Sequence, residues 1–235
     1  LLAGVYDARA IGKNGVSNPR AFAVGVLDEI MAEKPATSLD LAKEVPLNST
    51  LNARADANAA HYFRVAAKKG QRVLARCDAR AIDSRFEPVL AAIDEHGHEI
   101  DRNRRGGLLD FTAPAAGAFV IKVHDLVYRG GAELWYRLSI GTFSHVDFVF
   151  PPAVAVGKNK LTVFGRNLPG GQACQDVLVD GKPLEQLETE IDVPVDAAGG
   201  VVTGAAPGPF QASADLYGFR INPSSEPVLL SLASS

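Results

Sequence analysis

Three arginines lie close together in one short polar segment of the chain. Arg102, Arg104 and Arg105 belong to the run D-R-N-R-R at positions 101–105. The guanidinium group is planar, and its N–H donors form a fixed fork that fits sulfate and carboxylate groups. These three residues are therefore candidates for binding an acidic or sulfated polysaccharide, and a solvated loop tip is the alternative.

Two aromatic residues, Tyr128 and Trp135, are candidates for a different kind of ligand contact. The face of an aromatic ring can stack on a sugar ring while the polar edge of the side chain stays hydrated. Trp135 shares its strand face with Arg137 and Ser139, opposite Tyr136. We therefore expect Trp135 to be an exposed aromatic residue, with a position at the rim of a core as the alternative.

A pair of histidines, His96 and His98, stands beside three carboxylates at positions 94, 95 and 99. Histidine and carboxylate side chains are common zinc ligands. Gly97 between the histidines is a turn residue, however, and side chains on a tight turn point apart rather than toward one ion. No further His or Cys stands nearby at a typical spacing, so we expect a solvated turn and no metal site.

No arrangement typical of catalysis occurs in the sequence. The chain has no G-x-S-x-G nucleophile motif, no H-E-x-x-H zinc motif and no P-loop signature. Cys77 lies on the same face of a predicted strand as Val73 and Ala75, which predicts a buried and unreactive thiol. We therefore expect no enzyme activity and no cofactor.

The composition of the 235 residues is ordinary for a globular protein, with 47% hydrophobic and 22% charged residues. The net charge of −3 gives no general attraction to nucleic acid. No apolar run approaches the roughly 20 residues that span a bilayer, so we expect no membrane insertion. The chain opens with Leu1 rather than Met, and we interpret it as a piece of a longer polypeptide.

Short apolar segments of alternating polarity recur along the chain, and Gly, Pro, Asn or Asp separates them. This pattern is typical of β-strands, and its spacing favours β-sandwiches over α/β folds. The predicted strands are Val5–Ile11, Leu47–Arg54, His61–Ala67, Gln71–Asp78, Val89–Asp94, Phe119–Asp125, Leu134–Ile140, Lys160–Gly165 and Val177–Val179. Only Val26–Ala32 and Leu39–Glu44 could be helical, and both are short.

Three segments in the middle of the chain carry a family resemblance. They read H-Y-F-R-V-A-A-K-K-G-Q-R-V (61–73), F-E-P-V-L-A-A-I-D-E-H-G-H-E-I (86–100) and L-D-F-T-A-P-A-A-G-A-F-V-I-K-V-H-D (109–125). Residues 36–143 thereby resemble the bacterial pre-peptidase C-terminal domain, as found in planctomycete-type surface proteins. The resemblance implies a jelly-roll-like β-sandwich without catalytic function, attached to a secreted or surface protein.

Turns with glycine separate the strands of this region. Glycine adopts positive φ without a steric cost, so we place hairpin tips at Lys69-Gly70, His96-Gly97 and Ala116-Gly117. The strands Phe119–Asp125 and Leu134–Ile140 are further expected to be antiparallel, with a turn at Arg129-Gly130-Gly131 between them.

Some members of this family bind calcium through carboxylates, and the sequence departs from that pattern. The family's Glu-Pro-Asn motif is replaced by E-K-P-A-T at positions 33–37. His61 stands where an acidic residue often precedes the strand tyrosine, and the loop that often carries paired aspartates holds the three arginines. Calcium requires about six to eight oxygen ligands, so we expect no calcium site.

The regions on either side carry a second resemblance. Residues 157–171 read G-K-N-K-L-T-V-F-G-R-N-L-P-G-G and resemble the first strands of a TIG-type immunoglobulin-like domain. The opening segment also resembles the closing one, because Tyr6 and Arg9 can be aligned with Tyr217 and Arg220, each within a strand-turn-strand pattern.

These two likenesses together predict three parts of the chain. We expect the last strands of an immunoglobulin-like domain and a linker at 1–35, the pre-peptidase-type sandwich at 36–143, and a TIG-type domain at 144–235. Cys77 and Cys174 would then lie in separate modules and remain unpaired, because a disulfide needs Cα atoms within about 7 Å.

The resemblance implies a non-catalytic, extracytoplasmic binding or spacer segment of a larger multidomain protein that is secreted, periplasmic or at the cell surface. Its partners would be the other domains of the same polypeptide and a polysaccharide or a surface protein, and not nucleic acid. The alternative is a carbohydrate-binding module with a defined glycan site at Trp135 or at the three arginines.

Overall fold

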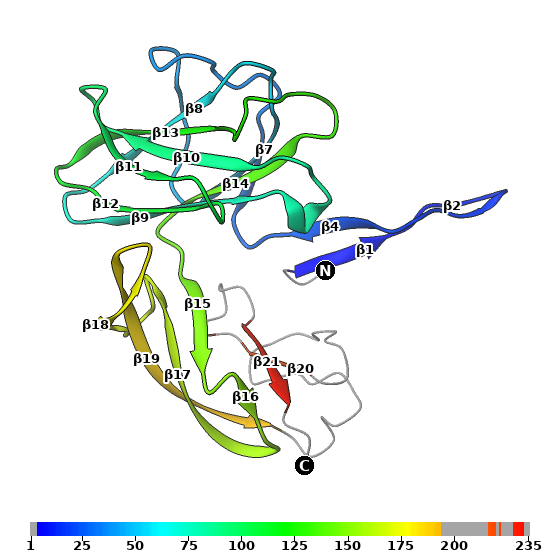
Figure 1. Cartoon of the computed structure of the whole chain (residues 1–235), viewed down its shortest axis with the longest axis vertical. Helices are drawn as coiled ribbons and strands as arrows, with labels where there is room; N and C mark the ends of the chain where they lie inside the picture. Colours follow the sequence, from blue (N-terminus) through cyan, green and yellow to red (C-terminus); the bar gives the residue numbers. More distant parts are fainter. Residues whose placement is uncertain (1–3, 194–215, 220, 222–227, 233–235) are drawn as a thin grey trace. The chain divides into compact units, whose positions relative to one another are not determined.

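The computed structural model describes residues 4–193, 216–219, 221 and 228–232. Within these residues the regular structure consists of β-strands and one short 3-10 helix, η1 (Arg80–Ile82) (Figure 1). The predicted all-β class is therefore confirmed. The chain divides into two compact units, Val5–Thr142 and Phe143–Ser235, and Leu1–Gly4 belongs with the second.

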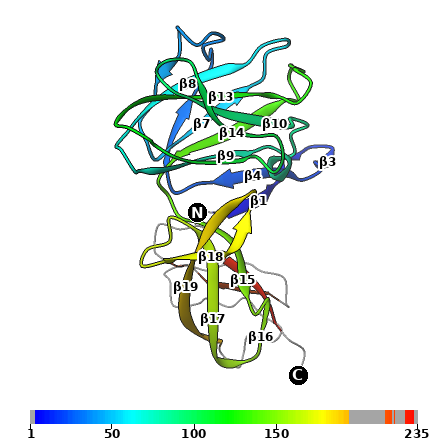
Figure 2. The same ribbon diagram turned by 60° about the vertical axis from the view of Figure 1, so that its left-hand side comes forward.

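The larger unit, Val5–Thr142, contains two five-stranded sheets that form the layers of a sandwich (Figure 2). The first has the order β11-β10-β13-β8-β6 and comprises β6 (Lys43–Glu44), β8 (His61–Ala67), β10 (Pro88–Ile93), β11 (Glu99–Asn103) and β13 (Gly117–Asp125). The second has the order β12-β9-β14-β7-β5 and comprises β5 (Asp28–Met31), β7 (Ser49–Arg54), β9 (Arg72–Asp78), β12 (Leu108–Thr112) and β14 (Trp135–Gly141).

The core of this unit follows from the alternation of its strands. Phe119 and Ile121 of β13 belong to one buried cluster with Tyr136, Leu138 and Ile140 of β14. A strand that buries one face places every second side chain in the core. Burial of each such side chain contributes roughly 1.5–3 kcal/mol to stability. The apolar face of each strand is therefore the face that packs against the core.

The connections between strands differ from the expected hairpins. The turn at His96-Gly97 does join a hairpin, because β10 pairs with β11. The turns at Lys69-Gly70 and Ala116-Gly117 instead join strands of opposite sheets, as does the segment between β13 and β14. Alternation shows that one face of a strand is buried, but it contains no information on which strand is the hydrogen-bonded neighbour. The hairpin interpretation was therefore wrong at these places.

The two segments that could be helical form strands instead. Val26–Ala32 contains β5, and Leu39–Glu44 ends in β6. Both are too short for a stable isolated helix, which needs about 12–15 residues. In the structure each adds a short parallel strand to the edge of a sheet, β5 beside β7 and β6 beside β8, and so covers backbone groups of that edge.

The first residues of the larger unit form a two-stranded ribbon. β1 (Gly4–Ala8) pairs with β4 (Arg20–Val24), and β2 (Ile11–Gly12) pairs with β3 (Gly15–Val16) in the hairpin between them. The backbone N–H of Ala21 donates to Asp83 Oδ2 at 2.8 Å, which attaches β4 to the chain directly after η1. The next strand after the ribbon is β5, so the ribbon leads straight into the sandwich.

The second unit contains two smaller sheets. The sheet β15-β17-β19-β18 comprises β15 (His145–Phe150), β17 (Gly157–Arg166), β18 (Gln172–Val179) and β19 (Lys182–Val193). The sheet β16-β21-β20 comprises β16 (Ala153–Val154), β20 (Leu216–Phe219) and β21 (Val228–Leu232). Val149, Leu161, Val163 and Leu230 share one buried cluster. Arg220, which the sequence alignment of the two ends uses, lies outside the described residues.

The chain between the two units is short and is fixed on both sides. The backbone N–H of Thr142 donates to Asn48 Oδ1 at 2.8 Å within the larger unit. The hydroxyl of Ser144 donates to the carbonyl oxygen of Asn167 at 2.7 Å within the second unit. Only Phe143 lies between these two anchored residues.

Candidate functional site

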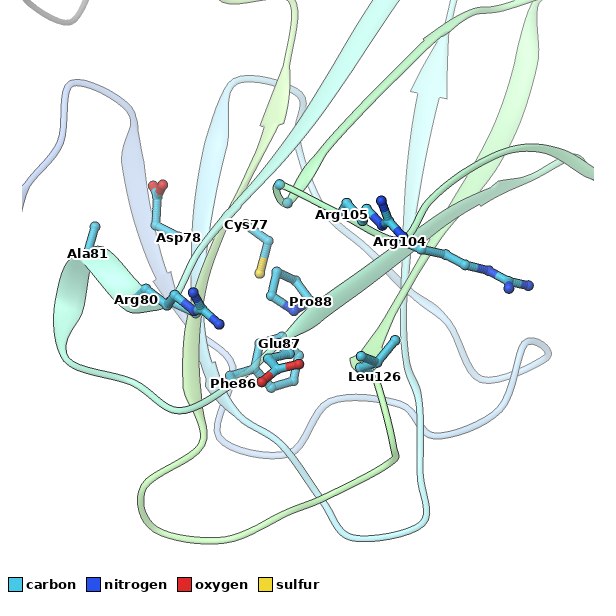
Figure 3. Close-up of a pocket in the computed structure, with 13 residues that line it drawn as sticks. Cys77, Asp78, Arg80, Ala81, Phe86, Glu87, Pro88, Arg104, Arg105 and Leu126 are labelled. Atoms are coloured by element: carbon cyan, nitrogen blue, oxygen red, sulfur yellow. The ribbon is translucent and has the colours of Figure 1, made fainter. Parts of the chain in front are cut away.

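A cavity of about 650 Å³ opens in the larger unit and is called here the arginine cavity (Figure 3). It lies where β9 ends, η1 follows, β10 begins and the loop between β11 and β12 returns. Its lining consists of Cys77, Asp78, Ala79, Arg80, Ala81, Phe86, Glu87, Pro88, Arg104, Arg105, Gly106, Gly107 and Leu126. Segments that are distant in the sequence thus form one site.

Two glycines bring the arginine-bearing loop close to β9. Gly106 and Gly107 have φ of 79° and 69°, the left-handed region that side chains rarely adopt. A Cβ on Gly107 would lie 2.6 Å from the carbonyl oxygen of Cys77. The Cys77 N–H also donates to the Gly107 carbonyl at 2.7 Å. This close approach places Arg104 and Arg105 at the cavity.

Three arginines line the arginine cavity, Arg80, Arg104 and Arg105. Figure 3 shows Arg80 on one side and the other two on the opposite side, with Cys77 and Pro88 between them. Within the described part of the chain, no carboxylate lies within ion-pair distance of any of these three arginines. They remain able to bind an anion.

The two acidic residues of the cavity are neutralised by arginines outside its lining. Asp78 Oδ2 lies 3.1 Å from Arg76 Nη2, and Glu87 Oε1 lies 3.7 Å from Arg129 Nη2. Neither acid is therefore committed to Arg80 or Arg105. The charge that remains directed toward the cavity is positive.

A buried carboxylate fixes the chain beside the cavity. Asp125 is 1% exposed and accepts hydrogen bonds from the Arg129 guanidinium, with both distances at 2.9 Å. It also accepts bonds from the backbone N–H groups of Glu87, Val127 and Arg129. Burial alone would raise the pKa of Asp125, but these donors outweigh burial and lower the pKa to about 2.

The arginine cavity contains no activated nucleophile. Cys77 is buried, and burial together with the negative charge of Asp78 raises its pKa well above the usual value. Cys77 and Cys174 are both free thiols. Among the residues that the structure describes, no group of three or more His, Cys, Asp or Glu side chains could hold a metal ion.

The three predicted arginines separate into two groups. Arg102 lies on β11, where its guanidinium is paired with Glu99, and it does not line the cavity. Arg104 and Arg105 do line it, together with Arg80, which sequence analysis missed. Arg80 belongs to a turn far away in the sequence, and only the fold brings it to the other two.

The two predicted aromatic residues do not lie together. Tyr128 has φ of 57° and stacks on His124 with ring centroids 4.1 Å apart. Trp135 is half-buried, at the rim rather than exposed, and its indole N–H donates to the carbonyl oxygen of Ile82 at 2.9 Å. Neither lines the arginine cavity.

Trp135 instead lines a second cavity of about 510 Å³, called here the tryptophan cavity. Its lining consists of Ala21, Phe22, Ala23, Val24, Gly25, Glu29, Asn52, Ile82, Trp135 and Arg137. Arg137 is 6% exposed and is ion-paired with Glu29, which also accepts a hydrogen bond from the Asn52 amide at 2.5 Å. This cavity combines two aromatic side chains with a charge pair that cancels itself.

The histidine pair lies at the tip of the hairpin between β10 and β11. His96 and His98 are both exposed, and their backbone N–H groups donate to Asp94 Oδ1 at 2.9 and 2.8 Å. The single carboxylate of Asp94 is thus used to stabilise the turn. Partial desolvation raises the pKa of Asp94, but these two hydrogen bonds and the neighbouring His98 side chain together outweigh it and lower the pKa.

No protein-family model matches the chain, and no curated protein matches it. Among solved structures, the periplasmic inhibitor of g-type lysozyme, PliG, from Aeromonas hydrophila matches with a TM-score of 0.35 and 16% identity, covering 43% of this chain and 96% of that chain. The pre-peptidase C-terminal domain of collagenase from Bacillus anthracis matches with a TM-score of 0.35 and 13% identity, covering 42% and 93%. Within the described residues, no helix has the length and apolarity needed to cross a membrane.

Proposed function

We propose that this chain is a non-catalytic binding and spacer segment of a larger extracytoplasmic protein, and that its arginine cavity binds an acidic polysaccharide. The observation that carries this proposal is the position of Arg80 and Arg105. Both guanidinium groups line one cavity, and neither has an acidic partner among the described residues. Arginine forms paired hydrogen bonds to sulfate and carboxylate groups, which acidic polysaccharides carry in repeated positions.

The dimensions and charge of the cavity suit such a ligand. A volume of about 650 Å³ lies within the range of roughly 300–1,000 Å³ that is typical of ligand-binding cavities. The arginines are exposed at its surface, so a long chain can reach them without entering the core. Because exposed charges are screened by salt, we expect affinity to fall as ionic strength rises.

The non-catalytic part of the proposal is supported by the chemistry of the lining. Covalent catalysis needs a nucleophile that a neighbouring base or a lowered pKa activates. Cys77 is the one thiol in the lining of the cavity, and its pKa is shifted in the opposite direction. Binding without turnover is therefore the expected behaviour.

The spacer part of the proposal concerns how the segment continues into its neighbours. We propose that the residues up to the end of β4 belong to the end of a preceding immunoglobulin-like domain, that the pre-peptidase-type sandwich runs from β5 to residue 143, and that 144–235 form a TIG-type domain. One observation in support is that the opening residues form a paired ribbon, β1 with β4, as the closing residues pair β20 with β21. In the second unit β21 also pairs with β16.

Calorimetric titration with dextran sulfate, and with uncharged dextran as its control, tests the binding proposal. The double variant Arg80→Ala/Arg105→Ala should bind dextran sulfate at least about 100-fold more weakly, because it removes two charged contacts and each charged hydrogen bond contributes roughly 1.5–3 kcal/mol. The variant Lys68→Ala/Lys69→Ala removes the same charge at a different turn and should bind like the original protein. Equal weakening by both variants would show that only the general charge matters and would overturn the proposed site.

A second candidate function is supported by the tryptophan cavity. Its aromatic side chains and its neutralised polar groups are typical of sites for uncharged sugars. This candidate predicts measurable binding of neutral dextran, weakened by Trp135→Ala and unaffected by salt. An absence of dextran binding at millimolar concentration would exclude it as an independent function.

A further inference from the structure

We infer that the arginine cavity and the tryptophan cavity are two parts of one groove, which binds a single polysaccharide chain containing both acidic and uncharged sugars. This inference rests on the proposed function, because the acidic part of the ligand is the one held by Arg80 and Arg105. It adds that the binding site is longer than the arginine cavity and that the ligand is recognised over several sugars.

The linings of the two cavities meet within the η1 turn. Ala81 lines the arginine cavity, and Ile82, the next residue, lines the tryptophan cavity. Consecutive Cα atoms are about 3.8 Å apart, so no further residue of the chain separates the two linings here. The Trp135 indole donates to the carbonyl of Ile82, which ties the tryptophan ring to this turn.

The cavities also meet across two neighbouring strands. Asp78 of β9 lines the arginine cavity, and its paired residue on β14 is Arg137, which lines the tryptophan cavity. Side chains of directly paired residues project from the same face of a sheet, with Cβ atoms about 4.5–5.5 Å apart. One residue of each lining therefore lies beside one residue of the other on this face of the sheet.

The tryptophan cavity has the chemistry for an uncharged sugar. Phe22 is 52% exposed at the cavity, and Trp135 is held there by its indole hydrogen bond. Glu29 neutralises Arg137, so no net charge from this pair remains to attract an anion. Asn52 and the two charged groups supply donors and acceptors of the kind that sugar hydroxyls pair with.

Strand β4 and Gly25, which follows it, form one side of this cavity, and the glycine makes their close approach possible. A Cβ on Gly25 would overlap Arg137 Nη2, so only glycine lets the chain lie directly on the guanidinium group. Phe22 and Gly25 are close in the sequence, so the same segment supplies an aromatic contact and covers the ion pair. The groove thus depends on this segment as well as on the sandwich.

The test is a length series of hyaluronan oligosaccharides, in which acidic and uncharged sugars alternate, from two to ten sugars, titrated calorimetrically at one salt concentration. We expect affinity to rise about tenfold between the shortest ligand and a length that reaches both cavities, and then to stay constant. Trp135→Ala and Phe22→Ala should each remove this gain with length, so that the longest oligosaccharide binds no more tightly than the disaccharide. Phe22→Ala is included because Phe22 is exposed and its truncation leaves the core intact.

Phe150→Ala is the matched control, since Phe150 is a 65% exposed aromatic residue of the second unit and lines neither cavity. If Phe22→Ala and Trp135→Ala keep the full gain with length, the cavities are separate sites, and the inference is wrong while the proposed function stands. If Arg80→Ala/Arg105→Ala binds every oligosaccharide as tightly as the original protein, the proposed function itself fails.

Discussion

The arginine cavity and the tryptophan cavity adjoin in one unit, yet they use arginine in opposite ways. Arg80 and Arg105 are exposed and have no acidic partner among the described residues, so water or a ligand can solvate them. Arg137 is buried and paired with Glu29. A buried charge without a partner costs several kcal/mol, whereas an exposed one costs little. Burial therefore decides which arginines serve the fold and which remain available for binding.

The largest effect should come from removing the partner of the buried arginine. Glu29→Ala leaves Arg137 charged, buried and unpaired, and should lower the free energy of unfolding by about 3 kcal/mol. Arg137→Met should cost only about 1 kcal/mol, because the remaining Glu29 is partly exposed and can be hydrated. Urea unfolding of both variants measures the difference. Equal losses would mean that Arg137 reaches water, and the contrast between the two cavities would disappear.

The next effect concerns the arginine cavity, whose neighbouring chain depends on a buried acid. Asp125→Ala removes the acceptor for Arg129 and for three backbone N–H groups, and should destabilise the protein by roughly 2–3 kcal/mol at neutral pH. The pKa of Asp125 is lowered to about 2, so its contribution is complete above the ordinary carboxyl pKa and is lost as the pH falls toward 2.

The deficit of the Asp125→Ala variant should accordingly shrink between pH 4 and pH 2. Chemical unfolding at a series of pH values measures this convergence. A deficit that stays constant down to pH 2 would indicate that packing, and not the ionised carboxylate, gives Asp125 its importance.

A smaller effect is expected from the aromatic cluster behind the arginine cavity. Phe86 stacks on Tyr136, whose hydroxyl lies 2.6 Å from His61 Nδ1. Burial lowers the pKa of His61, while the hydrogen bond and charge of Asp56 raise it by less. A His whose pKa is lowered in the folded state stabilises the protein fully above its unfolded pKa of about 6.5. Stability should therefore decline as the pH falls from 7 to 5.

The variant His61→Gln should reduce this decline. Part of the slope should remain, because burial also lowers the pKa of His124. Urea midpoints at pH 7 and pH 5 for both proteins give the comparison. A protein that becomes more stable on acidification over this range would contradict the neutral, buried state of His61.

The smallest effect is a difference in thiol reactivity that leaves stability unchanged. Cys77 is buried at the arginine cavity with a raised pKa, whereas Cys174 is only half-buried. A maleimide reagent at pH 7 should modify Cys174 in the native protein and Cys77 only as the protein unfolds. In the variant Cys174→Ser, only the reaction of Cys77 with the reagent is measured. Rapid native labelling of that variant would mean that the cavity gives water free access to Cys77.

The sequence predicted the strands of the sandwich well, because their alternation is a local property. In β13 and β14 the side chains expected to alternate inward are those of the buried cluster. The sequence predicted poorly which strands are hydrogen-bonded to each other, because that depends on the packing of the whole chain. For example, the consecutive strands β8 and β9 lie in opposite sheets. The alternation looks the same whether two consecutive strands pair within one sheet or lie in opposite sheets, so it does not distinguish the two arrangements.

The candidate site shows the same division between local and distant information. Arg104 and Arg105 were recognisable as neighbours in the sequence, but Arg80 reaches them only through the fold. Trp135 was placed on the correct face of its strand. The segment that covers this face and makes Trp135 half-buried comes from residues 21–25 and could not be inferred from the alternation of β14 itself.

The single-residue link at Phe143 has a mechanical consequence. Thr142 and Ser144 are each anchored in their own unit, so the polypeptide holds almost no slack there. A pulling force on the chain would pass directly between β15 and β14. Since β14 is hydrogen-bonded along both sides, to β7 and to β9, extension must shear two ladders at once. A force applied through this link would therefore load β14 in shear along both of its hydrogen-bonded edges.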